Sequence, residues 1–250
     1  MINLFIVGCG EVGNALAEFF KYKVKIHKID LDLKPNVYVN ADDVKILAIC
    51  YPYTEDFVNN TINYQIDIVP DVTLIFSTVP IGTTRQIPKA IHIPIEGRHP
   101  NFDFINMTWH LGLGTNCNGH IYSLLCGAGI DYKSIHTYDN PSITEAMKLL
   151  STLNYGVNIE FERFVADIMK TVGGSHSDWM WYTIGYNKLY KDTGFKRYEL
   201  TPPNGPIGGH CVVPNAKLLN EQGFDNPFID MVISQYDNKG EIKNDMFNTI

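Results

Sequence analysis

The first half of the chain alternates short apolar runs with polar or amphipathic segments, which is typical of a parallel α/β sheet. Two of the intervening segments, Gly13–Tyr22 and Asp56–Tyr64, have helical character, and the first has an apolar face. We predict strands at Asn3–Val7, Lys23–Ile29, Val44–Cys50, Val72–Ser77, Ala90–Ile93, His120–Leu125 and Ser134–Tyr138.

After about Asp139 the apolar residues recur at helical spacing instead. The longest such segment runs from Ile143 to about Val172, and paired glycines end it. Shorter helices are predicted at Ser177–Lys191, Val213–Gln222 and Pro227–Tyr236. The fold class we predict is therefore α/β: a Rossmann-type parallel sheet at 1–139, followed by an all-helical domain at 140–250 built on the long helix.

Composition narrows the class of protein. The 250 residues are 45% hydrophobic and 19% charged, as in an ordinary globular protein. A net charge of −7 without a basic cluster argues against nucleic-acid binding, and no apolar stretch is long enough to span a membrane. Five cysteines without a CxxC pair, and an N-terminus that opens directly on a strand-like run, lead us to expect reduced thiols, no signal peptide and a cytoplasmic location.

A glycine-rich sequence follows the first predicted strand and opens the first helix. Gly8, Gly10 and Gly13 form a GxGxxG pattern between a predicted strand and a predicted helix. In this context the pattern predicts a dinucleotide-binding turn. Asp30 ends the second predicted strand, where an acid bonds the ribose hydroxyls and repels a 2′-phosphate. Asp32 is the alternative for that role. We predict NAD as the cofactor, with further contacts from Glu11, Val12, Tyr51, Pro52, Ser77 and Thr78.

Four segments, in order, resemble the nucleotide-sugar dehydrogenase family, which includes UDP-glucose and GDP-mannose dehydrogenases. They are the glycine-rich turn, Phe76–Thr84 (FSTVPIGTT), Thr144–Leu150 (TEAMKLL) and Gly205–Pro214 (GPIGGHCVVP). The resemblance implies an NAD-binding domain and a helical, dimer-forming middle domain. It also implies that the family's third domain, which binds the nucleotide, is absent from this chain.

The same resemblance implies which residues carry the chemistry. Cys211 corresponds to the family's nucleophile, which forms a thiohemiacetal with an aldehyde intermediate. Lys148 corresponds to the lysine that stabilises oxyanions, Thr78 to the threonine that positions water, and Glu96 to a glutamate before glycine. Independently, the glycine-rich approach to Cys211 and the helix start that follows it favour a reactive thiolate, although a single cysteine is more often structural.

Two positions depart from the family. Asn215 stands where the family has an aspartate, and Thr152 where it has an asparagine. Because an amide cannot act as a carboxylate base, hydrolysis of a thioester intermediate is in question. The predicted function is NAD-dependent oxidation of an alcohol or aldehyde, with a sugar or sugar nucleotide as the candidate substrate. The alternative is an NAD-binding protein without full turnover, serving as a sensor or assembly partner.

Several other residues have open roles. Gly208, Gly209, His210, Arg98 and His99 are the candidate substrate-binding residues, although Arg98 and His99 equally fit a solvated loop and His210 equally fits a turn cap. Aromatic residues between 179 and 186 fit either a packed helical interface or a sugar-stacking platform. The spacing of His110, Cys117 and His120 matches no standard zinc pattern, so we predict no metal site.

Overall fold

The computed structural model describes residues 1–30, 40, 42–97, 102–114, 119–194, 196–203, 207 and 211–237. The chain forms two compact units, Met1–Lys148 and Leu149–Ile250. The N-terminal unit thus includes the first turns of the long helix, beyond the predicted domain boundary at 139/140. The two units are described separately below.

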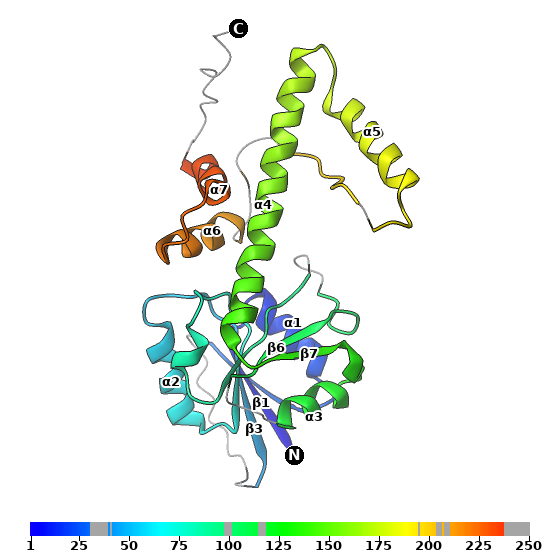
Figure 1. Ribbon diagram of the computed structural model, residues 1–250. Helices are drawn as coiled ribbons and strands as arrows, with labels where there is room; N and C mark the ends of the chain where they lie inside the picture. Colours follow the sequence, from blue (N-terminus) through cyan, green and yellow to red (C-terminus); the bar gives the residue numbers. More distant parts are fainter. Residues whose placement is uncertain are drawn as a thin grey trace. The chain divides into compact units, whose positions relative to one another are not determined.

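A seven-stranded sheet forms the centre of the N-terminal unit, in the strand order β2-β1-β3-β4-β5-β6-β7 (Figure 1). Neighbours from β2 to β5 are parallel, β6 is antiparallel to β5, and β7 is parallel to β6. This confirms the predicted α/β fold class. The strands are β1 (Ile2–Val7), β2 (Lys25–Ile29), β3 (Val44–Ile49), β4 (Val72–Ile75), β5 (Ala90–His92), β6 (Trp109–Gly112) and β7 (Ile135–Tyr138).

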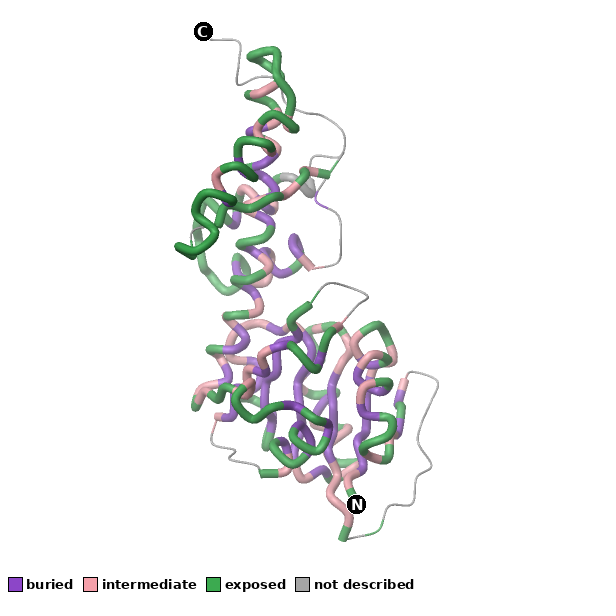
Figure 2. Tube along the Cα trace, turned by 90° about the vertical axis from the view of Figure 1, so that its right-hand side faces the viewer, coloured by how far each residue is buried: buried purple, intermediate pink, exposed green. Residues whose placement is uncertain are grey.

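Helices cover both faces of the sheet, so the central strands are apolar on both sides, as expected for parallel strands. On one face, α1 (Glu11–Phe20) and α3 (Gly119–Gly127) pack against alternate residues of β1, β3 and β4. On the other face, α2 (Phe57–Ile68) packs through Phe57 against the remaining residues of the same strands. Figure 2 shows the resulting band of buried residues through the centre of this unit.

One prediction for this region is wrong, and one strand was missed. The segment predicted as a strand at His120–Leu125 is helix α3, and β6 at Trp109–Gly112 was not predicted. The three apolar residues Ile121, Leu124 and Leu125 are buried at helical spacing, so one helix face meets the sheet. The other predicted strands and helices are present with small shifts at their ends, and 3₁₀ turns occur at Thr84–Gln86 and Tyr132–Ser134.

The helical unit is built on the long helix α4 (Pro141–Thr171) with α5 (His176–Leu189), α6 (Val212–Glu221) and α7 (Pro227–Asp237). Gly156, in the middle of α4, lies close to both of the last two helices. A Cβ atom at this position would lie 2.6 Å from Cγ1 of Val212 and 3.1 Å from Cγ2 of Val232. None of the helices that the structure describes is long and apolar enough to cross a membrane.

Candidate functional site

The glycine-rich turn joins β1 to α1, and its three glycines have different reasons to lack a side chain. Gly8 has φ +93°, and a Cβ there would lie 2.8 Å from the backbone nitrogen of Tyr51. At Gly13 a Cβ would lie 2.0 Å from the carbonyl oxygen of Gly8. At Gly10, no described atom lies within 4 Å of such a Cβ. The chain's own packing thus demands glycine at two positions, and at the third the space beside the helix N-terminus stays open.

That open space has the features that a pyrophosphate requires. Gly10 is the N-cap of α1, so the first backbone N–H groups of the helix lie beside it without a side-chain cap. Glu11 and Val12 are the first two residues of the helix and provide those groups. The residues present therefore fit a dinucleotide.

Asp30 follows directly after β2 and is hydrogen-bonded to the turn. The backbone N–H of Cys9 donates to Oδ2 of Asp30 at 3.1 Å. Burial, followed by the nearby Asp30 carboxylate, raises the pKa of the Cys9 thiol. The Asp30 carboxylate thus lies at the carboxyl edge of β2, beside the glycine turn. In dinucleotide-binding sheets of this kind, an acid at this point accepts hydrogen bonds from the adenosine ribose hydroxyls.

Two further polar residues flank the turn and were not predicted. Nζ of Lys28 donates to Oδ1 of Asn14 at 2.8 Å, and Nδ2 of Asn14 donates to the carbonyl oxygen of Cys9 at 2.5 Å. The sequence could have indicated Lys28, because side chains alternate between the two faces of a strand and Lys28 therefore lies on the same face as Asp30. Asn14, in the first helical turn, has no comparable signal.

The predicted contacts after β3 and β4 also lie at the carboxyl edge of the sheet. Oγ of Ser77 donates to the carbonyl oxygen of Tyr51 at 2.6 Å and ties the two strand ends together. The Tyr51 hydroxyl is 2.6 Å from Oγ1 of Thr61 on α2, and burial raises its pKa to about 12. Pro52 is exposed and Thr78 is half-buried at the same edge.

The start of α4 brings a second group of predicted residues to this edge. Nζ of Lys148 donates to the carbonyl oxygen of Ile95 at 2.7 Å, directly before Glu96. Glu96 is half-exposed, and its Oε1 is 3.3 Å from Nε2 of His110 on β6. Lys148 and Glu96 are therefore brought together through the segment that follows β5.

Glu145 and His92 support this corner, and neither was assigned a role from the sequence. The Glu145 carboxylate accepts hydrogen bonds from the backbone N–H groups of Gly82, at 2.5 Å, and Thr84, at 2.8 Å. Nδ1 of His92 is 2.9 Å from Oγ1 of Thr144, and burial lowers the pKa of His92 to about 3. The TEAMKLL segment thus anchors the FSTVPIGTT loop, a contact between distant segments that local patterns do not reveal.

In the helical unit, Cys211 is the N-cap of α6 and is half-buried. The predicted position of the cysteine at a helix start is therefore present. The two residues that depart from the family contact each other: Nδ2 of Asn215 donates to Oγ1 of Thr152 at 3.0 Å. Thr152 in turn donates to the carbonyl oxygen of Leu149 at 2.9 Å. Asn215 is buried, so its amide stabilises the packing of α6 on α4.

Some predicted residues lie outside the described part of the chain. These are the substrate-binding candidates Gly208, Gly209, His210, Arg98 and His99, together with Asp32 and Cys117. Among the described residues, no group of three or more His, Cys, Asp or Glu side chains is placed to hold a metal ion.

The chain is similar to known proteins in structure but not in sequence. No family model and no curated protein sequence matches the chain. A UDP-D-ManNAc dehydrogenase from Pyrococcus horikoshii superimposes with a TM-score of 0.74 at 14% identity, over 94% of this chain and 68% of the other. For a UDP-glucose dehydrogenase from Pyrobaculum islandicum the TM-score is 0.68 at 16% identity, over 95% and 68%.

A smaller dehydrogenase is similar over nearly its whole length. The 3-hydroxyisobutyrate dehydrogenase of Mycobacterium tuberculosis superimposes with a TM-score of 0.64 at 12% identity, covering 95% of this chain and 93% of the other. The predicted resemblance to nucleotide-sugar dehydrogenases is thus confirmed in structure. The chain has the fold that these nucleotide-sugar and hydroxyacid dehydrogenases share.

Proposed function

We propose that this protein is an NAD-dependent dehydrogenase that oxidises an alcohol or aldehyde, with a sugar or sugar nucleotide as the candidate substrate. The observation that carries the proposal is the carboxyl edge of the sheet. There the open face of Gly10, the Asp30 carboxylate and the Lys148 ammonium belong to one compact unit. A nucleotide-binding turn alone is compatible with many functions. An ammonium group in the same unit favours oxidation of a hydroxyl, because it can stabilise negative charge on the substrate oxygen.

Each residue at this edge has a definite role in the proposal. The helix N-terminus at Gly10 binds the pyrophosphate, and Asp30 accepts hydrogen bonds from the ribose. The bound nicotinamide would accept a hydride from the substrate carbon. The positive charge of the Lys148 ammonium stabilises negative charge that develops on the substrate oxygen. The hydrogen bond to the Ile95 carbonyl holds this ammonium at a fixed position. Thr78 is the candidate for positioning water, and Glu96 is a further catalytic candidate.

The covalent step is assigned to Cys211 through the family resemblance. The thiolate attacks an aldehyde to give a thiohemiacetal. This would lose a hydride to a second NAD to give a thioester, which water must hydrolyse. Asn215 donates its amide hydrogen to Thr152 and cannot act as a base. We therefore expect slow hydrolysis of the thioester, and Asn215→Asp should accelerate it.

A second candidate is a single two-electron oxidation without a covalent step. The observation that favours it is the match to a 3-hydroxyisobutyrate dehydrogenase over 93% of that chain. In this case Lys148 alone serves the reaction, and Cys211 is a structural thiol at the start of α6. The two candidates differ in the number of NADH molecules formed per substrate molecule.

The deciding experiment follows NADH formation with NAD and a panel that contains UDP-glucose, GDP-mannose, 3-hydroxyisobutyrate and simple alcohols and aldehydes. Lys148→Ala should abolish turnover in either candidate. Cys211→Ser should abolish it only in the covalent mechanism, whereas Cys126→Ser, at an exposed thiol on α3, is the matched control. If NAD binds but no panel member is oxidised, the protein is an NAD-binding sensor or assembly partner instead.

We also propose that the protein forms a homodimer through its helical unit. Phe164 and Ile168 lie on α4, and Trp181 lies on α5, with exposed fractions of 56%, 37% and 73%. Large apolar side chains exposed along two helices are typical of a protein–protein interface.

A further inference from the structure

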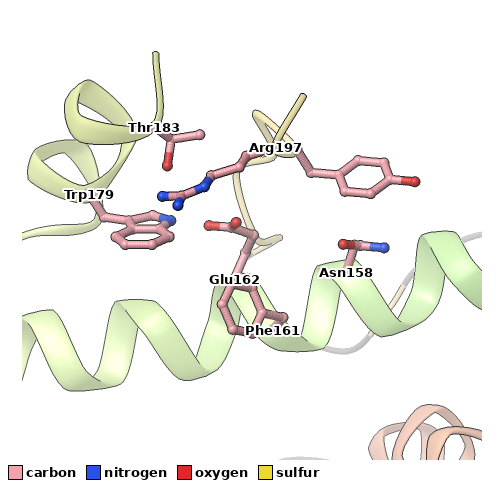
Figure 3. A pocket seen from close by; sticks show the side chains of 7 residues that line it. Asn158, Phe161, Glu162, Trp179, Thr183 and Arg197 are labelled. Atoms are coloured by element: carbon pink, nitrogen blue, oxygen red, sulfur yellow. The ribbon is translucent and has the colours of Figure 1, made fainter. Parts of the chain in front are cut away.

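The helical unit contains a pocket that has no part in the proposed dehydrogenase chemistry. It has a volume of about 410 Å³ and lies between α4, α5 and the segment around Arg197 (Figure 3). This volume falls in the range of roughly 300–1,000 Å³ that small-molecule sites occupy. Asn158, Phe161 and Glu162 line it from α4, and Trp179 and Thr183 line it from α5.

The pocket is on a different face of α4 from α6, whose N-cap is Cys211. The helix α6 meets α4 at Gly156. The pocket residues of α4 come two, five and six positions later, which places them about 120–160° around the helix axis from Gly156. A ligand in the pocket is therefore separated from the Cys211 end of α6 by the helix itself.

Two buried polar atoms face this pocket without a partner. Oγ1 of Thr183 and Nε1 of Trp179 have no hydrogen-bond partner among the described residues, and Thr183 is only 1% exposed. These residues are one helical turn apart on α5, so their side chains point the same way. A buried polar group without a partner is destabilising, and native structures pair the large majority of such groups.

Opposite charges face the pocket from its two sides. Glu162 is 3% exposed, and one of its oxygens, Oε2, is 2.8 Å from Nε2 of His176. The Arg197 guanidinium stacks on the Tyr186 ring at 3.6 Å and forms no ion pair with any carboxylate that the structure describes. Figure 3 shows the Trp179 indole, the Thr183 hydroxyl, the Arg197 guanidinium and the Glu162 carboxylate directed at one space. With one carboxylate and one guanidinium present, neither a simple anion nor a simple cation is matched.

Aromatic rings form much of the remaining wall. Phe161 and Trp179 meet edge to face, with ring centroids 6.4 Å apart, and Tyr198 also lines the pocket. The Tyr198 hydroxyl accepts a hydrogen bond from Asn154, so its ring is held in place. The pocket thus combines apolar ring faces with donors and acceptors of hydrogen bonds.

We propose that this pocket binds a neutral monosaccharide. Sugar hydroxyls both donate and accept, so they can satisfy the Trp179 and Arg197 donors and the Glu162 acceptor at the same time. The C–H face of a pyranose packs on the aromatic walls. This inference does not rest on the dehydrogenase activity, because every residue that carries it belongs to the helical unit.

The test uses the full-length protein and the indole N–H signals of its three tryptophans in ¹H–¹⁵N NMR. The probes are D-glucose and N-acetyl-D-glucosamine, with glucuronate and glycerol for comparison. A saturable shift of the Trp179 signal, assigned with Trp179→Phe, is expected with a neutral sugar. The signal of Trp109, whose Nε1 donates to the Phe104 carbonyl, should stay in place.

Matched variants separate binding from folding. Thr183→Val removes the unpaired hydroxyl at almost constant volume, so we expect sugar affinity to fall about tenfold while the unfolding midpoint is unchanged or raised. Trp181→Phe, on the same helix but 73% exposed and outside the pocket, should leave affinity unchanged. Cys211→Ser should also leave sugar binding intact, which keeps this test apart from that of the proposed function.

Several results would overturn the proposal. These are the absence of a saturable shift with both neutral sugars, an affinity that Thr183→Val does not reduce, or tighter binding of glucuronate than of D-glucose. A Trp179 signal that shifts with protein concentration, and not with sugar, would show that a second copy of the chain fills the pocket instead.

Discussion

Replacement of Gly13 by alanine should destabilise the N-terminal unit strongly. A Cβ there would lie 2.0 Å from the Gly8 carbonyl oxygen and 3.3 Å from Cγ2 of Ile6, so α1 would have to move away from β1. Overpacking of this kind costs about 1–3 kcal/mol or more, and the contact is severe enough for the upper end. Alanine in a helix returns about 1 kcal/mol relative to glycine. The net loss of unfolding free energy should be about 2 kcal/mol, measured by denaturant titration.

The control is Gly10→Ala, three residues earlier in the same turn. Its φ of −72° suits any residue, and no described atom lies within 4 Å of the new Cβ. Alanine is a poorer N-cap than glycine by roughly 1 kcal/mol, but it also lowers the entropy of the unfolded chain by a similar amount, so stability should change by about 0.5 kcal/mol or less. The affinity for NAD, measured by calorimetry, should nevertheless fall about tenfold, or 1.4 kcal/mol, because the methyl group occupies the space proposed for the pyrophosphate.

The two variants therefore separate packing from ligand approach. Equal stability losses in both, or a Gly13→Ala protein as stable as the parent, would refute the packing argument. A Gly10→Ala protein that binds NAD with unchanged affinity would refute the location of the pyrophosphate.

Four further outcomes are expected. NAD should bind more tightly than NADP in calorimetric titrations, and Asp30→Ala should weaken NAD by about 1–3 kcal/mol; equal affinity for both cofactors in the parent would contradict the role of Asp30. Iodoacetamide should label Cys211 before the exposed Cys126 by mass spectrometry, because a cysteine at a helix start adjoins unpaired backbone N–H groups; an inert Cys211 would exclude the covalent mechanism. Because burial lowers the pKa of His92 to about 3, only the unfolded chain gains its proton as the pH falls from 7 to 5. The unfolding free energy should drop by about 2 kcal/mol over this interval, and His92→Gln should remove that part of the slope. Light scattering should give the mass of a dimer at micromolar concentration, and a monomer throughout would exclude the proposed interface.

Much of the fold was predictable because its signals are local. The strand, glycine turn and helix at the N-terminus follow from adjacent residues, as does the long apolar periodicity that became α4. The failure at α3 has a physical reason. A short apolar run that contains Ile121 and Tyr122 has the composition of a strand. Its helical character is evident only from which residues are buried, since Ile121, Leu124 and Leu125 share one helix face that packs on the sheet.

Parts of the site were not predictable because they join distant segments. Glu145 anchors Gly82 and Thr84 across the N-terminal unit, and no short-range pattern indicates that contact. The pocket in the helical unit is similar. The spacing of Trp179 and Thr183 was visible, but the buried Glu162 opposite them depends on how α5 packs against α4.

Gly156 shows how a residue without chemistry can limit the evolution of this chain. Alanine in the interior of a helix ordinarily adds about 1 kcal/mol relative to glycine, so it is among the simplest stabilising substitutions. Here the added methyl group would meet Val212, the residue next to Cys211. Selection for a more stable α4 would therefore displace the thiol, and selection for a fixed thiol would keep the helix weaker than it could be. If Cys211 is the nucleophile, thermostabilised variants of this protein should retain glycine at 156 and gain their stability elsewhere.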